Sequence, residues 1–308
     1  MQPNPQETLS TQPELTPGDN QKNTSKSPFQ LAFRRFLKNK MAVVSLIFLL
    51  LIVVICILAP VFTDQDPELT DLFKIEQGPT DEHILGTNGT GQDNFSRLLY
   101  GGRISLLVGF SAMFFTLTIG ILLGSLAGYY GGKVDSIIMR AADIMLMLPF
   151  LVLTLTIIAI LEKITIPIFV TIIAVTSWPN LTRIIRGTYL SLREQEFVLG
   201  ARAIGASDFR IILKHFIPNA IGPIIVNATL MMATYIIIES ALSFIGFGIP
   251  QPTPTWGNML SEAMNVRILR DHPEAWIPPG IAIFVTVLAI NFIGDGLRDA
   301  FDPKSKQR

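Results

Sequence analysis

The stretch MAVVSLIFLLLIVVICILAPVFT, residues 41–63, contains no Asp, Glu, Lys, Arg or His. A helix needs roughly 20 apolar residues to cross the hydrocarbon core of a bilayer, so this stretch predicts a membrane span. The whole chain agrees with that interpretation, because 49% of its 308 residues are hydrophobic and only 16% are charged. Soluble domains carry about 25% charged residues. The sequence therefore predicts a membrane protein.

Further runs without charged residues or histidine lie at 104–132, 144–161, 164–182, 216–238, 240–261 and 275–294. The run 240–261 contains three prolines and several glycines, so we expect the end of one span followed by an irregular loop. Pro149 predicts a kink in another run. Together the runs predict an all-α polytopic membrane protein with six spans, at about 41–61, 104–128, 139–161, 164–182, 219–240 and 277–294.

The distribution of Lys and Arg predicts which side of the membrane each loop occupies. With the N-terminus inside, eighteen of the 24 basic residues lie on the cytoplasmic side, as the positive-inside rule requires. Both termini and a loop at 191–218 are then cytoplasmic, and loops at 62–103 and 246–276 are external. Whether 246–276 re-enters the membrane stays open. The formal net charge of zero gives no general attraction to nucleic acid.

The ends of the chain differ from the apolar centre in composition. Residues 1–30 are rich in Pro, Gln, Thr and Asn, which predicts a disordered cytoplasmic tail. Residues 31–40 include FRRFLKNK, and this predicts a basic juxtamembrane segment whose side chains extend to the inner membrane surface. The membrane domain is then expected over 41–303, followed by a short cytoplasmic tail at 304–308.

The charged segment EFVLGARAIGASDFRIILKHFIPN, residues 196–219, lies between two predicted spans. Just upstream, Ser191 and Glu194 fit a capping box that would start a short helix. Gly205 can end that helix in a left-handed conformation, which glycine adopts at little cost. The sequence therefore predicts a helix followed by a tight glycine turn on the cytoplasmic side.

Four residues of this helix share one face, at positions i, i+3, i+4 and i+7: Phe197, Gly200, Ala201 and Ile204. The face is small and apolar, which suits docking into a groove of another protein. A second helix is expected to start at Ser207 or Asp208 and to stop at Pro218. Alternatively, both helices rest on the bilayer with basic side chains toward the lipid headgroups. The residues alone leave both interpretations open.

Two polar residues of the fifth span are candidates for a pore or gate, Glu239 near its outer end and Asn227 within it. A charge in a membrane favours a functional role, whereas a boundary acid can be solvated and an amide more often links helices. The sequence contains no G-x-x-x-x-G-K-[ST] loop and no metal-ligand or nucleophile–base motif. We therefore expect a non-catalytic chain without a metal or cofactor, whose energy comes from elsewhere.

Three long motifs occur in the order of one family of membrane proteins: HILGTNGTGQDNFSRLLYGGRISLLVGF (83–110), SFIGFGIPQPTPTWGNML (243–260) and PPGIAIFVTVLAINFIGDGLRDAFDP (278–303). With them the chain resembles the second permease subunit of the dipeptide, oligopeptide and nickel branch of bacterial binding-protein-dependent ABC importers. It departs from the branch pattern at two positions, because Asn88 replaces an aspartate and Gln92 replaces an arginine.

The family's cytoplasmic loop carries the pattern E-A-A-x3-G-x9-I-x-L-P. Here Ala201, Gly205 and Pro218 match the pattern, and Leu199 stands in the place of its glutamate. The resemblance implies a type I ABC importer transmembrane domain with a cytoplasmic coupling helix. It also implies an ATPase contact that includes Glu196, Phe197, Gly200, Ala201, Ile204, Gly205, Ala206, Ser207 and Pro218.

The resemblance covers about residues 30–303 and implies a permease that imports dipeptides or oligopeptides through the cytoplasmic membrane. The implied partners are two ATP-binding subunits, a second homologous permease subunit, an extracellular solute-binding protein and membrane lipid. The same architecture serves glutathione and nickel chelates within this branch. A secondary transporter is a further alternative, although it needs an ion site near the midplane and no span carries a central charge.

Overall fold

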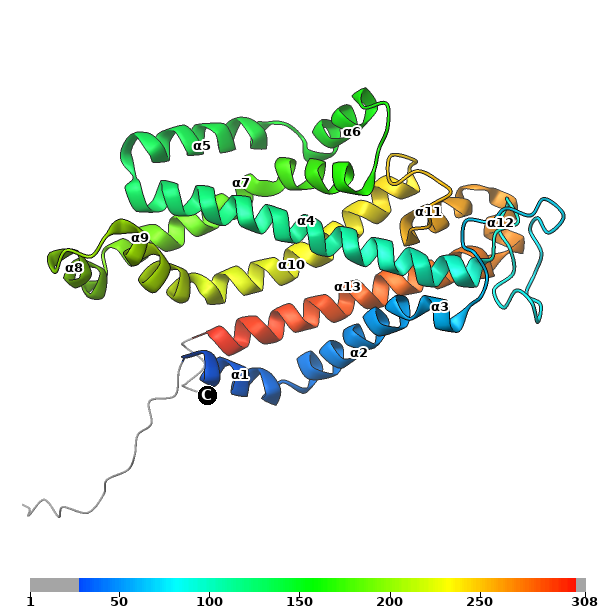
Figure 1. Cartoon of the computed structure of the whole chain (residues 1–308), viewed down its shortest axis with the longest axis horizontal. Coiled ribbons are helices and arrows are strands. Elements are labelled where there is room, and N and C mark those ends of the chain that lie inside the picture. Colours follow the sequence, from blue (N-terminus) through cyan, green and yellow to red (C-terminus); the bar gives the residue numbers. More distant parts are fainter. Residues whose placement is uncertain (1–27, 303–308) are drawn as a thin grey trace, which may run out of the picture.

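A computed structural model describes residues 28–302 as a bundle of helices (Figure 1), and the predicted all-α fold is confirmed. Five helices are long and apolar enough to cross a membrane. They are α2 (Lys40–Ile57), α4 (Asn94–Tyr130), α7 (Ile166–Arg193), α10 (Ile217–Phe244) and α13 (Pro273–Phe301). A sixth crossing results if α5 (Gly132–Met147) and α6 (Phe150–Ile160) together form one broken span.

Shorter helices lie before and between the spans: α1 (Pro28–Lys38), α3 (Ala59–Phe62), α8 (Glu196–Ala203), α9 (Asp208–Ile211), α11 (Trp256–Leu260) and α12 (Val266–Asp271). The loop predicted at 246–276 is thus partly helical. Of the predicted disordered tail 1–30, residues 1–27 lie outside the described residues, and the other three begin α1. The predicted tail 304–308 also lies outside the described residues.

The bend between α5 and α6 follows from Pro149. The two helices are inclined to each other by 85° across a short break. Leu148 is extended there, with φ −87° and ψ 129°, as is typical of a residue before proline, and the proline ring cannot continue the helical hydrogen bonds. The predicted kink is confirmed. With 11 residues, α6 alone extends only about 16 Å, so it cannot cross the bilayer without α5.

Helix α4 begins ten residues before the predicted start of its span, because Asp93 caps its first turn. One carboxylate oxygen of Asp93 accepts a hydrogen bond from the backbone N–H of Ser96 at 2.7 Å. The other lies 2.9 Å from Nδ1 of His83, and both side chains are buried. A cap of this kind stabilises a helix by about 1 kcal/mol. The polar loop before the span thus fixes where α4 begins.

Helices α4 and α7 approach each other closely through a stripe of glycines on α4. The glycines and the α7 side chains that they meet are both spaced by four residues: Gly120 with Leu181, Gly124 with Ile185 and Gly128 with Tyr189. A Cβ atom on Gly124 would lie 2.7 Å from Cβ of Ile185 and 2.8 Å from the carbonyl oxygen of Thr182. Since only glycine leaves room for this contact, the stripe sets the distance between the two helices.

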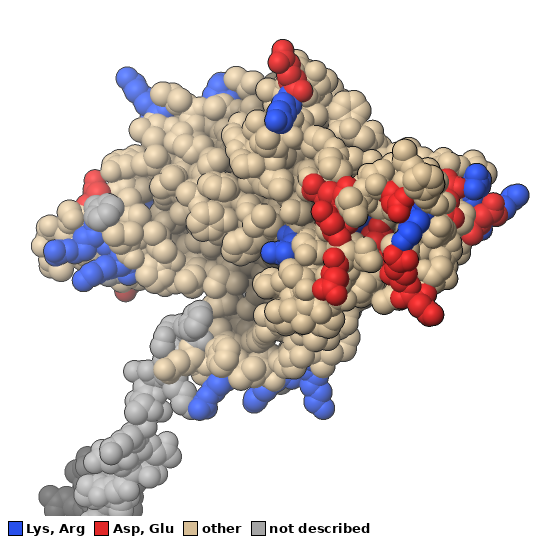
Figure 2. Space-filling view, turned by 45° about the vertical axis from the view of Figure 1, so that its right-hand side comes forward, with Lys and Arg blue, Asp and Glu red and all other residues tan. Residues whose placement is uncertain are grey.

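The loops of the bundle gather at two ends, which we name the α8 end and the α12 end. Figure 1 shows α8 and α9 at the left, with α1 and the last turn of α13 also toward the left, and α12 with the loop after α3 at the right. In Figure 2, Asp and Glu gather mostly toward the α12 end, and few charged side chains lie on the surface between the two ends. The spans expose large apolar side chains such as Phe48, Phe114 and Phe284, as a surface in contact with lipid requires.

Candidate functional site

The 191–218 segment connects α7 to α10 at the α8 end, and a glycine turn closes α8. Gly205 has φ 79°, in the region that favours glycine. Its N–H donates to the carbonyl of Arg202 at 3.0 Å, and the N–H of Ala206 donates to the carbonyl of Ala201 at 3.0 Å. This pair of bonds is the Schellman arrangement. The predicted helix end at Gly205 is confirmed.

The start of α8 differs from the prediction. Helix α7 continues to Arg193, so Ser191 lies inside it, where the Ser191 hydroxyl donates to the carbonyl of Thr188 at 2.8 Å. Gln195 precedes α8 without a side-chain cap. The capping box predicted for Ser191 and Glu194 is therefore wrong. The side chain of Tyr189, two residues before Ser191, is buried in the core cluster that also contains Tyr129 and Val198.

Two side chains hold α8 against the bundle. Val198 is 0% and Ala201 is 8% exposed, and both belong to a core cluster that includes Tyr129, Tyr189, Ile211 and Phe216. The predicted apolar face is consequently divided. Val198 and Ala201 lie three residues apart on the side of α8 that packs against the bundle. Ala201 therefore points into this protein and does not lie on the exposed side as predicted.

The opposite side of α8 is open. Ile204 is 86% exposed and Phe197 is 42% exposed. Ala206 is half-buried. The remaining residues of the predicted contact are exposed: Glu196, Gly200, Gly205, Ser207 and Pro218. The 191–218 segment thus presents an apolar tip, formed by Phe197 and Ile204, beside a tight turn.

Tyr129, at the end of α4, ties the segment to the bundle and was missed from the sequence. Its hydroxyl donates to a carboxylate oxygen of Asp208 at 2.5 Å, and the guanidinium of Arg202 lies 5.2 Å from the centre of its ring. Such a cation–π contact contributes about 0.5–1 kcal/mol. The only sign of this role in the sequence is an aromatic residue with a polar tip at the end of an apolar run.

The second helix of the segment does not stop at Pro218, so that prediction is wrong. Helix α9 passes into a π-helical turn, Ile212–Phe216, and then directly into α10. The N–H of Ile217 donates to the carbonyl of Ile212, five residues back. The wider turn leaves Pro218 in the first turn of α10, where its missing N–H is tolerated. The segment is therefore continuous with the span that follows it.

A cavity of about 270 Å³ lies between the bent pair α5–α6 and helices α7 and α10. Its wall carries uncharged polar side chains: Thr176, Ser177, Asn180, Asn227, Thr234 and Tyr235. Nδ2 of Asn227 donates to the carbonyl of Pro223 in its own helix at 2.8 Å. Asn227 thus lies on the wall of a cavity within a span, and its role in a pore stays a prediction.

Glu239 lies fully buried where α10 meets α4 and α11. The hydroxyls of Ser105 and Ser243 donate to its carboxylate at 2.9 and 2.8 Å. Ser105 also accepts the backbone N–H of Trp256 at 3.2 Å. The carboxylate therefore joins three helices. Its burial excludes the solvated helix cap considered from the sequence, and a role in gating stays a prediction.

Asn88 and Gln92 stand where the branch pattern has an aspartate and an arginine. Both are 3% exposed, and Nδ2 of Asn88 donates to Oε1 of Gln92 at 3.0 Å. The same Gln92 oxygen accepts a hydrogen bond from the buried guanidinium of Arg97. An amide–amide hydrogen bond thus replaces the acid and base of the pattern, and it avoids placing a second cation beside Arg97.

Restoring only one charged partner is expected to destabilise the α12 end. Asn88→Asp alone puts a buried carboxylate against the Gln92 oxygen, and Gln92→Arg alone adds a second buried guanidinium. The double variant can form an ion pair. In a double-mutant cycle measured by thermal unfolding of the purified protein, we expect a favourable coupling energy of about 0.5–3 kcal/mol. Additive effects of the two single changes contradict this pairing.

Residues 120–307 match a family described as binding-protein-dependent transport system inner membrane component. Residues 27–79 match the N-terminal transmembrane domain of oligopeptide transport permease C. The dipeptide transport system permease protein DppC of Alkalihalophilus pseudofirmus is 41% identical over 298 residues, which cover 97% of each chain. The oligopeptide transport system permease protein OppC of Bacillus subtilis is 39% identical over 294 residues, 94% of this chain and 95% of that one.

Two other similarities differ in substrate or in extent. The glutathione transport system permease protein GsiD of Pectobacterium atrosepticum is 38% identical over 282 residues, 91% of this chain and 93% of that one. A chain from inward-facing structures of the MetNI methionine ABC transporter superposes with a TM-score of 0.56 at 19% identity. The superposition covers 68% of this chain and 97% of the MetNI chain. At this identity the likeness concerns the arrangement of helices alone.

Proposed function

The chain belongs to the family of binding-protein-dependent transport inner membrane components, and we propose that it forms half of the path through which an ATP-driven importer carries dipeptides or oligopeptides. The family and the ABC-importer fold expected from the sequence are confirmed. The chain is a multi-pass inner membrane protein and a non-catalytic permease subunit, so ATP is hydrolysed by a separate subunit.

In this proposal the α8 end faces the cytoplasm and the α12 end faces outward. Basic residues support it, since α1 and the 191–218 segment carry Lys and Arg, whereas the loop 64–93 carries eight acids and one lysine. Positive residues are retained on the cytoplasmic side during insertion. The start of α1 and the end of α13 both lie toward the α8 end (Figure 1), which agrees with an even number of crossings.

The exposed apolar tip of the 191–218 segment is the observation that carries the proposal. Phe197 and Ile204 face outward, while Val198 and Ala201 anchor the same helix to the bundle. A helix that is anchored on one side and apolar on the other suits insertion into a groove of a partner. We propose that this partner is one of two ATP-binding subunits.

A second, homologous permease would complete the translocation path next to the cavity of about 270 Å³ that lies between α5–α6, α7 and α10. The amide and hydroxyl groups of Asn180, Ser177 and Asn227 on its wall can exchange hydrogen bonds with peptide groups irrespective of the peptide's side chains. Closure of the ATPases would move the 191–218 segment and tilt α7 and α10, which continue directly from it. This is alternating access by rigid-body motion. An external solute-binding protein would supply the peptide.

Uptake in a deletion strain tests the proposed substrate class. Removing the chain is expected to abolish energy-dependent uptake of labelled dipeptides and tripeptides, and re-expression is expected to restore it, because the path lacks one half without this subunit. Labelled free amino acids serve as the control and should enter at an unchanged rate. Peptide uptake that persists unchanged in the deletion strain, with no second copy of the chain expressed, overturns the proposal.

Glutathione is a second candidate substrate, favoured by the 38% identity to a glutathione permease protein. The same deletion strain separates the two candidates. If labelled glutathione uptake is lost and the uptake of ordinary dipeptides is retained, the chain serves glutathione. Nickel uptake measured in parallel tests the third substrate class expected from the resemblance.

A further inference from the structure

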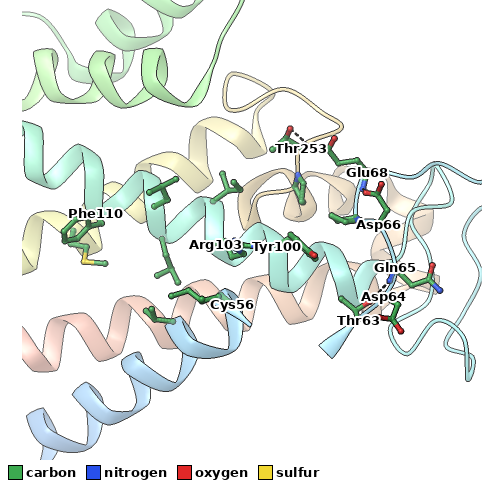
Figure 3. A pocket seen from close by; sticks show the side chains of 18 residues that line it. Cys56, Thr63, Asp64, Gln65, Asp66, Glu68, Tyr100, Arg103, Phe110 and Thr253 are labelled. Carbon is green, nitrogen blue, oxygen red and sulfur yellow. Dashed lines mark hydrogen bonds between the residues drawn. The ribbon is translucent and has the colours of Figure 1, made fainter. Parts of the chain in front are cut away.

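A cavity of about 950 Å³ opens at the α12 end, between α2, the loop after α3 and α4. Figure 3 shows Tyr100 and Arg103 of α4 near its centre, the acidic residues of the loop on one side and Phe110 on the other. The inner part of the wall is apolar and consists of Val53, Ile57, Leu106, Leu107, Phe110 and Met232. The cavity is therefore amphipathic along the direction of the spans.

The charged groups of this cavity have no ion-pair partners among residues 28–302. Arg103 lies with its guanidinium 5.5 Å from the centre of the Tyr100 ring, and no carboxylate of residues 28–302 forms an ion pair with it within 4 Å. Asp64, Asp66 and Glu68 line the same cavity and likewise form no ion pair there. One cation and three anions thus line one space without a direct ion pair between them, and Glu68 accepts a hydrogen bond from the hydroxyl of Thr253 at 2.9 Å.

The apolar part of the cavity reaches the surface that contacts lipid. Ile57, Leu107 and Phe110 are 59%, 50% and 52% exposed and belong to membrane-spanning helices or their ends. Phe110 follows Arg103 by seven residues on α4, a distance of about 10 Å along the helix axis. Tyr and Arg side chains are typical of the membrane–water interface. The charged part of the cavity therefore lies at the level of the lipid headgroups, with the apolar part below it.

We propose that this cavity binds one phospholipid whose headgroup carries a primary ammonium group. The phosphate lies against the guanidinium of Arg103, the ammonium group against Asp64 and Asp66, and an acyl chain along Leu107 and Phe110. Each charge of the headgroup then meets its opposite in the wall. An anionic lipid without the ammonium group is disfavoured, because its headgroup faces three carboxylates without compensation.

A peptide fits the same space less well than a lipid. Its amino terminus could pair with the acids, but its peptide groups would lie against side chains such as Leu106 and Met232, which offer no hydrogen bonds. Burying unpaired amide groups costs free energy, whereas burying methylene groups gains it. The apolar wall thus favours an acyl chain, and the peptide becomes an outcome of the test.

Lipid titration of the purified importer complex, measured by native mass spectrometry, tests this proposal. The delipidated complex is titrated with phosphatidylethanolamine or with phosphatidylglycerol. We expect saturable binding of phosphatidylethanolamine, preferred over phosphatidylglycerol. Arg103→Gln should weaken this binding by about tenfold or more, because it removes a charge-assisted contact to phosphate. Arg270→Gln, at an exposed position of α12 away from the cavity, is the matched control and should bind as the unchanged protein does.

The acids are tested by their effect on lipid preference. Asp64→Asn with Asp66→Asn should remove the preference for phosphatidylethanolamine over phosphatidylglycerol, while Asp81→Asn, elsewhere in the same loop, should retain it. Co-purification of the whole complex confirms that each variant is folded. Equal binding of both lipids to the unchanged protein overturns the proposal, as does an Arg103→Gln variant that behaves like Arg270→Gln. Displacement of the lipid by a dipeptide assigns the cavity to the transport substrate and also overturns it.

Discussion

Replacing Ile204 by glutamate is expected to reduce ATP-dependent uptake by about tenfold or more without reducing the amount of permease in the membrane. Ile204 is 86% exposed at the tip of the 191–218 segment, so the change removes no internal contact of this protein. If the tip inserts into an apolar groove of an ATP-binding subunit, the glutamate becomes an unpaired charge in that groove, which costs several kcal/mol. Co-purification of the ATP-binding subunits with tagged permease measures the loss directly.

Val266→Glu is the matched control for this experiment. Val266 is 72% exposed at the α12 end, so the same type of change is made on a similarly exposed side chain far from the 191–218 segment. The control should retain the ATP-binding subunits. Retention of these subunits and of uptake by Ile204→Glu would contradict the docking proposal. Membrane insertion of both variants is checked by their yield in solubilised membranes.

Ile204 is a better position for this test than Ala201 or Gly205, although the family pattern points to the latter two. Ala201 is 8% exposed and packs inward, so Ala201→Glu disrupts the attachment of α8 to its own bundle. Gly205 has φ 79°, so Gly205→Asp strains the turn itself. Loss of uptake in either variant has a structural cause in this chain and does not report on docking alone.

Gly124→Val is expected to prevent the permease from folding to a stable bundle. A Cβ atom at this position would lie 2.8 Å from the carbonyl oxygen of Thr182, and a backbone atom cannot rotate away. Overpacking of this kind costs about 1–3 kcal/mol and occasionally more, and here α4 would have to move away from α7 along the whole glycine stripe. We expect a loss of about tenfold or more in monodisperse protein, measured by size-exclusion chromatography in detergent.

Gly187→Val is the control for the glycine substitution. Gly187 lies on α7, and a Cβ atom there would have no heavy atom within 4 Å. The variant tests the cost of valine in a membrane helix without the cost of overpacking, and we expect nearly normal yield. Equal losses in Gly124→Val and Gly187→Val would show that the close approach of α4 and α7 does not limit folding.

Several features determined by nearby residues were predicted correctly from the sequence, although the capping box at Ser191 and Glu194 was not. The all-α fold follows from the long apolar runs, the kink from Pro149 and the end of α8 from Gly205, and each depends on backbone rules that act over a few residues. The predicted stop at Pro218 failed although its rule is also local. The π-helical turn before it changes the register of the hydrogen bonds, and no residue pattern marks that turn.

Features determined by distant helices could not be predicted. Which face of α8 is buried depends on Tyr129 of α4 and Phe216 of the π-helical turn, which form the surface that receives Val198 and Ala201. For this reason the face predicted along the sequence is divided: Ala201 lies inward, whereas Phe197 and Ile204 are exposed. The cavity around Arg103 likewise lies between α2, α4 and the loop after α3. The sequence does not show that Arg103 and the acids of this loop line the same cavity, because only the fold brings them together.

The glycine stripe has a mechanical consequence. With 37 residues, α4 is about 55 Å long, and its close packing against α7 at Gly120, Gly124 and Gly128 opposes bending there. The helix begins at the Asp93 cap, and its other end is tied to the start of α9 through the bond between Tyr129 and Asp208. No proline interrupts α4 between these points. A rotation imposed at the 191–218 segment is therefore expected to reach the loop at Asp93 along a helix that no proline interrupts, so that α4 moves as a rigid body.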